Sequence, residues 1–182
     1  IFSETYYFDE LRLKPYYAFT ARQLPEAAAF LNKLIQHTQE TKLSIVHGDY
    51  SPKNILIHQE KLILLDHEVI HYGDPAFDIG FSMTHLLSKM LHLQEKRESF
   101  LNFCLTYWDA YQQQTEKLLQ LKGFETRALQ HTMACLLARV KGKSPLEYLD
   151  KKEQTLQLNI VFSLLKNIPG SMDDLIQNFF NA

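Results

Sequence analysis

The stretch HGDYSPKN, His47–Asn54, most constrains what this chain can fold into, because it places a polar turn between two short apolar runs. Leu43–Val46 precedes the turn and Ile55–His58 follows it, and both have the aliphatic character of strands. A reversal at Gln59–Lys61 leads to a third such run, Leu62–Asp66. The spacing predicts either a small, largely buried sheet or β-loops lying on helices. The polar turn then becomes a loop on a rigid scaffold, where function commonly lies.

The rest of the chain has the apolar periodicity of helices. Pro25 and Pro75 stand where the first turn of a helix tolerates proline, and Asp74 is a natural cap. Ser144 and Glu147 have the spacing of a capping box. The expected helices run from Pro25 to near Thr41, from Pro75 to Met90, from Glu95 to about Leu121, from Thr126 to about Arg139, from Pro145 to about Lys166, and through Gly170–Phe180. We predict a mainly helical fold with a small β-hairpin patch.

The composition is that of a globular chain of one domain: 182 residues, 46% hydrophobic, 22% charged, with a net charge of −2. Without a Lys/Arg block, the sequence lacks the electrostatic footprint of a nucleic-acid binder. No apolar run approaches the roughly 20 residues of a membrane span. Cys104 and Cys135 lie in helix-like segments, which predicts buried free thiols and a cytoplasmic protein. We therefore expect no nucleic-acid and no membrane partner.

Three side chains around the polar turn have the pattern of a metal site. Asp49 leaves the first strand, Asn54 closes the loop, and the following hairpin returns the chain so that Asp66 comes near Asn54. We expect two carboxylates and one amide oxygen to converge on one cleft. Hard oxygen ligands of this kind suit Mg²⁺, which keeps water and phosphate oxygens for its other positions. The remaining carboxylate can orient and deprotonate a hydroxyl.

The pattern H-x-D-x-x-x-x-N, followed by an aspartate, is that of the protein-kinase catalytic loop and its metal ligand. His47, Asp49 and Asn54 fit it, with Gly48 where protein kinases commonly carry Arg, and LLDHE stands in place of Asp-Phe-Gly. Together with GDPAFDIG, these motifs resemble the aminoglycoside phosphotransferase and choline kinase-like superfamily. The stretch from RQLPEAA to ARVKGKSPLEYL looks like a bacterial phosphotransferase family within it, so that the resemblance covers most of the chain.

The resemblance assigns roles position by position. It implies that Asp49 is the catalytic base, which accepts the proton of a substrate hydroxyl. It further implies that Asn54 and Asp66 hold Mg²⁺ on the phosphates of ATP or GTP. Glu68 matches a carboxylate that some small-molecule kinases use near the metal, and it is the weaker candidate.

Other positions of the motif imply supporting or substrate-side roles. His47 is expected to brace the loop, and Asp78 to lie beneath it and accept backbone N–H bonds. The lysine that protein kinases often carry two residues after the base is replaced by Ser51, and the lysine of this loop is Lys53. Arg139 belongs to a short basic run, either a solvated turn or a contact for phosphate or an anionic substrate. Ser51, Lys53 and Arg139 are therefore candidate substrate or phosphate contacts.

The resemblance also sets the expected domain organisation. The sequence has six glycines and no G-x-G-x-x-G, and the strand lysine of the kinase fold is not visible. In this superfamily those parts belong to an N-terminal nucleotide-binding lobe, so we expect residues 1–182 to be the C-terminal lobe alone. Within it we expect a connector (1–24), the catalytic and metal-binding loops (43–80) and a helical substrate-side region (81–182). The aromatic-rich Phe2–Tyr17 segment is expected to face the absent lobe and to support self-association.

We therefore predict an ATP-dependent small-molecule phosphotransferase with an alcohol group as acceptor, inactive when reduced to this lobe. The alternative is a kinase-like binding module that keeps the fold without turnover. A metal-dependent hydrolase has less support, because neither a second metal cluster nor an activated-water site is visible. Residues 95–149, expected to form the acceptor pocket, show no acidic stripe of the kind that a polycationic aminoglycoside prefers. The sequence does not identify the acceptor.

Overall fold

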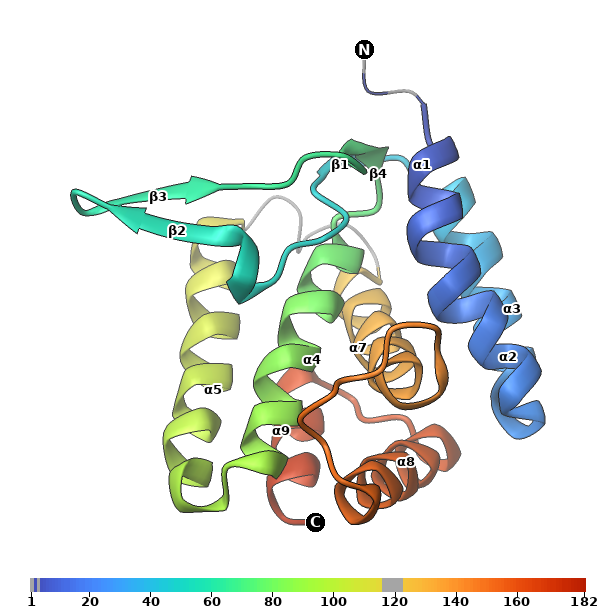
Figure 1. The fold of residues 1–182 in the computed structure, drawn as a ribbon, viewed down its shortest axis with the longest axis vertical. Helices are drawn as coiled ribbons and strands as arrows, with labels where there is room; N and C mark the ends of the chain where they lie inside the picture. The colour runs from blue at the N-terminus through green and yellow to red at the C-terminus, as the bar shows by residue number, and fades with distance from the viewer. Residues whose placement is uncertain (1, 3, 116–122) are drawn as a thin grey trace.

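A computed structural model describes residues 2, 4–115 and 123–182, and these are mostly helical, as expected (Figure 1). The helical segments are α1 (Tyr6–Phe8), the π-helix η1 (Asp9–Ala18), α2 (Phe19–Gln23), α3 (Pro25–Glu40), the 3₁₀ turn η2 (Pro52–Asn54), α4 (Ala76–His92), the 3₁₀ turn η3 (Gln94–Lys96), α5 (Arg97–Gln114), α7 (Phe124–Lys141), α8 (Lys151–Lys166) and α9 (Met172–Phe180). The region expected as a connector is thus helical from α1 to α2. Helix α5 ends at Gln114, and the rest of the helix expected to reach Leu121 falls within residues 116–122, outside the described part.

The strands form two separate antiparallel ladders instead of one sheet. β2 (Ile55–His58) pairs with β3 (Lys61–Leu64) as a hairpin, and β1 (Ser44–Val46) pairs with a fourth strand, β4 (His71–Gly73). The three residues of β4 are too few to show a periodicity in the sequence, so only the structure reveals this strand.

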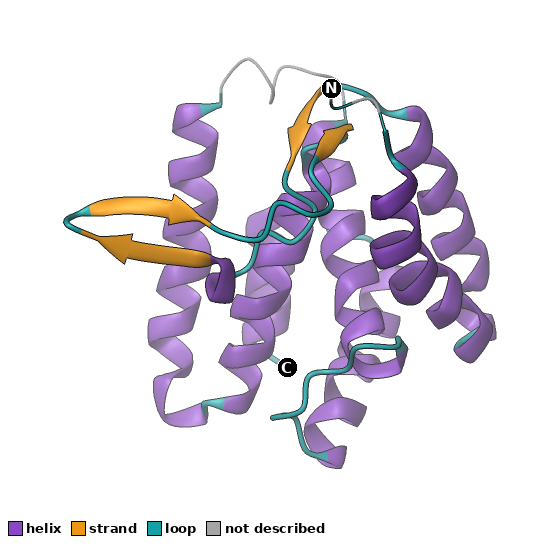
Figure 2. Cartoon of the chain, turned by 45° about the horizontal axis from the view of Figure 1, so that its top comes forward, coloured by secondary structure: helices purple, strands orange, loops and turns teal. Residues whose placement is uncertain are grey.

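The expectation of a largely buried sheet, or of β-loops lying on helices, is wrong for the hairpin. All four residues of β3 and three of the four in β2 are exposed. Figures 1 and 2 show why: the hairpin extends outward from the helical body, past α5. Its apolar side chains therefore face solvent, with Ile57 and Leu62 each 72% exposed.

The helix expected to begin at Ser144 begins six residues later, and the predicted capping box is wrong. Asp150 is the N-cap of α8: its carboxylate accepts the N–H of Glu153, and the Glu153 carboxylate accepts the N–H of Asp150. The Ser144 segment instead forms a tight turn in which the Leu146 N–H donates to the Arg139 carbonyl. Leu146 is buried by this turn, so tertiary contacts decide between two similar local signals.

Helices α4 and α7 form the centre of the helical body (Figure 1). Gly80 of α4 permits their close approach, because a Cβ at this position would collide with His131 of α7. Cys104 and Cys135 are buried free thiols, as the sequence predicts. No helix in the described ranges has the length and apolar character needed to cross a membrane.

His131 is a polar group at the middle of this core. It is fully buried, and its Nδ1 lies 2.9 Å from the hydroxyl of Tyr17. Burial lowers the pKa of His131 to about 4, with the nearby Arg127 acting in the same direction and Asp74 opposing it. The folded protein therefore holds this imidazole neutral at physiological pH.

We predict that His131 makes the fold sensitive to acid. Because the folded pKa lies below the unfolded value of about 6.5, its stabilisation is present above pH 6.5 and is lost as the pH falls towards 4, by on the order of 3 kcal/mol. Urea unfolding at pH 7.5 and pH 4.5 should show a smaller difference for His131→Leu than for the wild type. The control variant His58→Gln, at an exposed position, should keep the wild-type difference in unfolding free energy between the two pH values. The same difference in all three proteins would contradict the role of His131.

Candidate active site

Asp49 is a buried carboxylate on which three donors converge. Its Oδ2 lies 3.2 Å from Arg12 Nη2 and 3.1 Å from Lys53 Nζ, and it accepts a 2.8 Å hydrogen bond from Asn54 Nδ2. The residue is only 3% exposed. The other oxygen, Oδ1, has no partner among the described residues. One oxygen of Asp49 is therefore fixed, and the second remains open to accept a further hydrogen bond.

Asn54 is oriented by the loop that it closes. It ends the 3₁₀ turn η2, and its Nδ2 also donates to the backbone carbonyl of Asp49, at 2.9 Å. Both donor contacts use the amide nitrogen, which leaves the Asn54 Oδ1 as a free acceptor. The Leu65 N–H donates to the Asn54 carbonyl, at 2.9 Å, and so brings Asp66 beside the loop. Asp49 and Asn54 are therefore in direct contact. Asp66 directly follows Leu65, the residue whose N–H is bound to Asn54.

Asp66 differs from Asp49 in being exposed. Its backbone is left-handed, with φ = 65°, a conformation that Asp and Asn tolerate better than most residues. Glu68, two residues on, is also exposed. The described residues contain no group of three or more His, Cys, Asp or Glu that could hold a metal by themselves. A cation at this place would therefore depend on the Asn54 amide and on ligands outside the protein.

Asp78 lies beneath the loop and holds its backbone. Its two oxygens accept the N–H of His47, at 2.7 Å, and the N–H of Gly48, at 2.8 Å. Burial raises the pKa of Asp78 to about 6, although the two hydrogen bonds oppose this shift. Gly48 has φ = 78°, and a Cβ there would lie 2.8 Å from Val69. The loop thus requires glycine at the position where protein kinases commonly carry arginine.

His47 links the loop to the end of the hairpin. The Asp49 N–H donates to its Nδ1, at 3.2 Å, so Nδ1 is the unprotonated nitrogen. The other nitrogen, Nε2, therefore carries the proton and donates to the Leu65 carbonyl, at 3.0 Å. Burial lowers the pKa of His47, which favours this neutral state. His47 thus contacts the backbone on both sides of Asn54, at Asp49 and at Leu65.

Arg12 is the residue of this site that the sequence did not reveal. Besides its ion pair with Asp49, its Nε donates to the Gly48 carbonyl, at 2.7 Å. It is buried and comes from the π-helix η1, far from the loop in sequence. The only signal in the sequence was an arginine within an aromatic-rich segment that we expected to be a connector.

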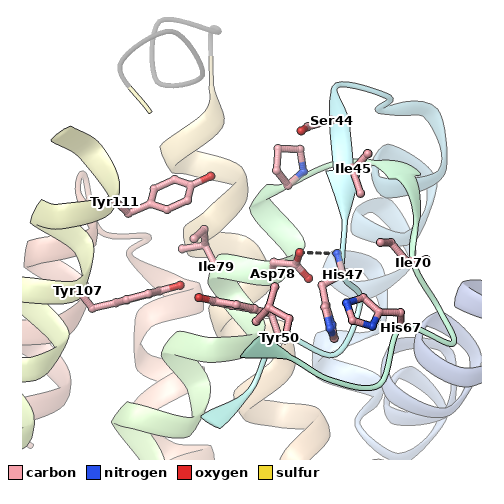
Figure 3. Close-up of a pocket in the computed structure, with 12 residues that line it drawn as sticks. Ser44, Ile45, His47, Tyr50, His67, Ile70, Asp78, Ile79, Tyr107 and Tyr111 are labelled. Atoms are coloured by element: carbon pink, nitrogen blue, oxygen red, sulfur yellow. Dashed lines mark hydrogen bonds between the residues drawn. The ribbon is translucent and has the colours of Figure 1, made fainter. Parts of the chain in front are cut away.

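A first pocket, of about 330 Å³, lies between the loop and α5. We call it the tyrosine pocket, because Tyr50, Tyr107 and Tyr111 line it. Figure 3 shows Tyr107 and Tyr111 on α5, across the pocket from His47, with Asp78 between them. Its charged or titratable lining groups are two histidines and Asp78, in addition to the tyrosines.

A second pocket, of about 560 Å³, lies on another part of the loop and contacts α4 and α5. We call it the lysine pocket. Its lining residues are Ser51, Pro52, Lys53, His85, Leu86, Lys89, Leu93, Phe100 and Phe103. Two of the three candidate substrate contacts, Ser51 and Lys53, belong to it.

Arg139, the third candidate contact, lines neither of these two pockets and is mostly buried. Its Nη1 donates to the Ser144 carbonyl, at 3.0 Å, and its Nη2 lies 3.2 Å from His85 Nε2. The guanidinium also lies against the rings of Tyr16 and Phe81, 4.9 and 5.0 Å from their centres. Arg139 is therefore not a solvated turn residue, and it lines neither the tyrosine pocket nor the lysine pocket; it lies behind His85.

A comparison with known families matches part of the chain. Residues 5–90, slightly less than half of the chain, match the phosphotransferase enzyme family. The matched stretch contains Arg12, the catalytic-loop motif, the hairpin and Asp78. The resemblance to the aminoglycoside phosphotransferase and choline kinase-like family is thus confirmed over these residues. No curated protein matched the chain.

We predict that Asp78→Asn destabilises the protein by about 2 kcal/mol at pH 7.5. An amide offers one acceptor oxygen, so one of the two loop N–H groups would face an NH₂ group and lose its buried partner. Chemical denaturation measures the loss, with Asp109→Asn as control, since Asp109 is exposed on α5. If the two variants were equally stable, Asp78 would not be the support of the loop.

Proposed function

We infer that this protein is a kinase-like phosphotransferase that moves the γ-phosphoryl group of ATP or GTP to a hydroxyl group of a small molecule. The observation that carries the proposal is that the two oxygens of the Asp49 carboxylate have different surroundings. Oδ2 is held by Arg12, Lys53 and Asn54, whereas Oδ1 is open. A carboxylate that is fixed by one oxygen and free at the other suits a base that must meet a hydroxyl in a defined direction.

The proposed step follows from this geometry. The acceptor hydroxyl donates its hydrogen bond to Asp49 Oδ1, and its proton passes to that oxygen as the hydroxyl oxygen bonds to the γ-phosphorus. The bond between this phosphorus and the bridging oxygen of the nucleoside diphosphate breaks at the same time. Phosphoryl transfer asks mainly for positioning and charge neutralisation, so the protein's task is to hold the acceptor in line. Arg12 and Lys53 keep the Asp49 carboxylate in one orientation during that step.

The residues near Asn54 fit Mg²⁺. Asn54 presents an unused amide oxygen and Asp66 an exposed carboxylate, and both are hard oxygen ligands. Mg²⁺ bound by so few protein ligands keeps positions for water and phosphate oxygens, and it would neutralise charge on the nucleotide phosphates. Asn54 and Asp66 are therefore the proposed ligands, with Glu68 as a weaker addition.

We further propose that residues 1–182 act as the C-terminal lobe and that the nucleotide's phosphates are covered by a separate lobe. The sequence offers no Gly-rich loop to do so. The exposed hairpin supports this proposal, because an isolated two-stranded hairpin with apolar side chains in water is at best marginally stable. Tyr6 and Tyr7, each 59% exposed, add aromatic surface. They belong to α1, which lies at the upper right of Figure 1, whereas the hairpin lies at the upper left. The same surface would support self-association of the chain alone.

Two variants separate the proposed roles, in a protein that includes the nucleotide-binding lobe. Asp49→Asn should lower kcat by about 10²- to 10⁴-fold while leaving nucleotide affinity nearly unchanged, because the base meets the acceptor. Asp66→Asn should instead raise the Kd for Mg²⁺–nucleotide, because it removes a charged ligand. Turnover assays and calorimetry measure the two effects. Equal losses of nucleotide affinity would refute the assignment, and a wild-type protein without turnover would favour the binding-module alternative.

The 182-residue chain alone should fold, because its helices share one core, but it should bind ATP–Mg²⁺ only weakly and transfer no phosphate. Titration calorimetry and a phosphorylation assay are the measurements. The protein with both lobes serves as the positive control. Tight nucleotide binding by the chain alone would show that the proposed division into lobes is wrong.

A further inference from the structure

The lysine pocket is connected to the proposed base through one of its lining residues, Lys53. Lys53 lines the pocket, and its ammonium lies 3.1 Å from Asp49 Oδ2. Ser51, which also lines it, is two residues from Asp49 in the same loop. A molecule in this pocket therefore lies beside the loop that would present Oδ1 to a hydroxyl group.

The charged groups around the lysine pocket are almost all positive. Lys53 and Lys89 line it, and no Asp or Glu is among its lining residues. Lys89 is half-buried, its ammonium lies 3.7 Å from the centre of the Tyr148 ring, and within the described ranges it has no carboxylate partner. Behind the wall, Arg139 contacts His85. Asp49, the carboxylate paired with Lys53, is already shared between two cations, so the residues that line the pocket have an excess of positive charge.

Two neutral polar groups in the wall are placed to complete a polar ligand site. The Ser51 hydroxyl is fully buried and has no hydrogen-bond partner among the described residues. Leaving such a group unsatisfied costs free energy unless a ligand or water meets it. His85 Nε2 must accept from Arg139, since arginine only donates, so the neutral ring carries its proton on Nδ1. Burial, with Arg139 as the second cause, lowers the pKa of His85 to about 4, so this state persists at neutral pH.

The rest of the wall is apolar. Phe100 and Phe103 of α5 meet edge to face, with ring centres 5.8 Å apart, and Phe103 is 58% exposed. Leu86 and Leu93 continue the same surface. An aromatic ring left this open beside two lysines is suited to cover the apolar part of a ligand.

From these contacts we propose that the lysine pocket is the acceptor site, and that the acceptor is a hydroxylated organic anion with an apolar portion. Its carboxylate or phosphate group meets Lys89 and Lys53, its apolar part lies on Phe100 and Phe103, and its hydroxyl reaches Asp49. The inference rests on the proposed function, because Asp49 must be the base for the hydroxyl to matter.

The tyrosine pocket has the opposite character and supplies the contrast that makes the proposal testable. Tyr50, Tyr107 and Tyr111 present aromatic rings, and Asp78 is its carboxylate. Aromatic rings with a nearby carboxylate suit a cation. A cationic acceptor would therefore choose the tyrosine pocket, and an anionic one the lysine pocket.

Three probes with the same phenyl ring and hydroxyl test the charge preference: 3-phenyllactate, its neutral amide, and the cation 1-amino-3-phenylpropan-2-ol. Each is titrated into the ¹⁵N-labelled chain, and amide shifts give both the Kd and the location. We expect phenyllactate to bind about tenfold more tightly than the amide, as a hydrogen bond to a charged group implies, and to shift residues of the lysine pocket. Equal affinities, or tighter binding of the cation, would overturn the proposal.

Lys89→Gln should remove most of the preference for phenyllactate while the Kd of the amide changes little. Lys33→Gln, which removes an exposed lysine of α3, is the matched control and should leave both values unchanged. Lys53→Gln provides a second pocket variant, and its side chain is exposed enough for the fold to tolerate the change. These binding measurements need no turnover, so they are independent of the tests on the Asp49 and Asp66 variants. The anion preference can be absent when those variants behave as expected, and it can be present when they do not. Shifts at Tyr50 and Tyr107 on adding phenyllactate would place the anion in the wrong pocket and refute the assignment.

Discussion

The structure around the loop depends on one partly buried interaction, the pair of hydrogen bonds from the His47 and Gly48 N–H groups to the Asp78 carboxylate. Burying a carboxylate is costly, and the raised pKa of Asp78, about 6, expresses that cost. A polar residue would be a poor choice here if stability alone mattered. The benefit is that Asp78 belongs to α4, a helix with many residues in the core, so the position of the loop is set by a well-packed element.

The loop that Asp78 holds in turn positions the residues around it. The positive φ of Gly48 turns the chain so that its carbonyl meets Arg12, whose guanidinium then fixes Asp49 Oδ2. His47 links the loop to the end of the hairpin, because its ring is hydrogen-bonded both to the Asp49 N–H and to the Leu65 carbonyl. Asp49 and Asn54 are thus held through neighbours, whereas the side chain of Asp66 is exposed. Such support is what fixes a base and its ligands within the small tolerance that phosphoryl transfer requires.

The sequence was most informative where chemistry limits the choice of residue. Asp49 and Asn54 follow a spacing that few other structures need, and the structure brings them into contact. The role of Arg12 could not be predicted, because its partner Gly48 lies 36 residues away and because nothing in the local sequence distinguishes a buried arginine from a surface one. The helix start at Asp150 escaped for a different reason: two capping signals stood close together, and the turn that buries Leu146 selected between them. Long-range packing, which a single sequence does not display, decided both cases.

The two pockets beside the loop differ in charge, whereas the loop itself is held by one set of contacts. Asp49 and Asn54 are fixed by Asp78, Arg12 and each other, and none of these contacts involves α5. Helices α4 and α5, by contrast, contribute residues that differ between the two pockets: Lys89, Phe100 and Phe103 in one, and Tyr107 and Tyr111 in the other. Substitutions on α5 can therefore change what binds without moving the base. Under the proposed function, the base and most of the residues that would select the acceptor lie on different elements, and Lys53 belongs to both groups. Such a separation is the physical condition under which a single fold can accept new substrates.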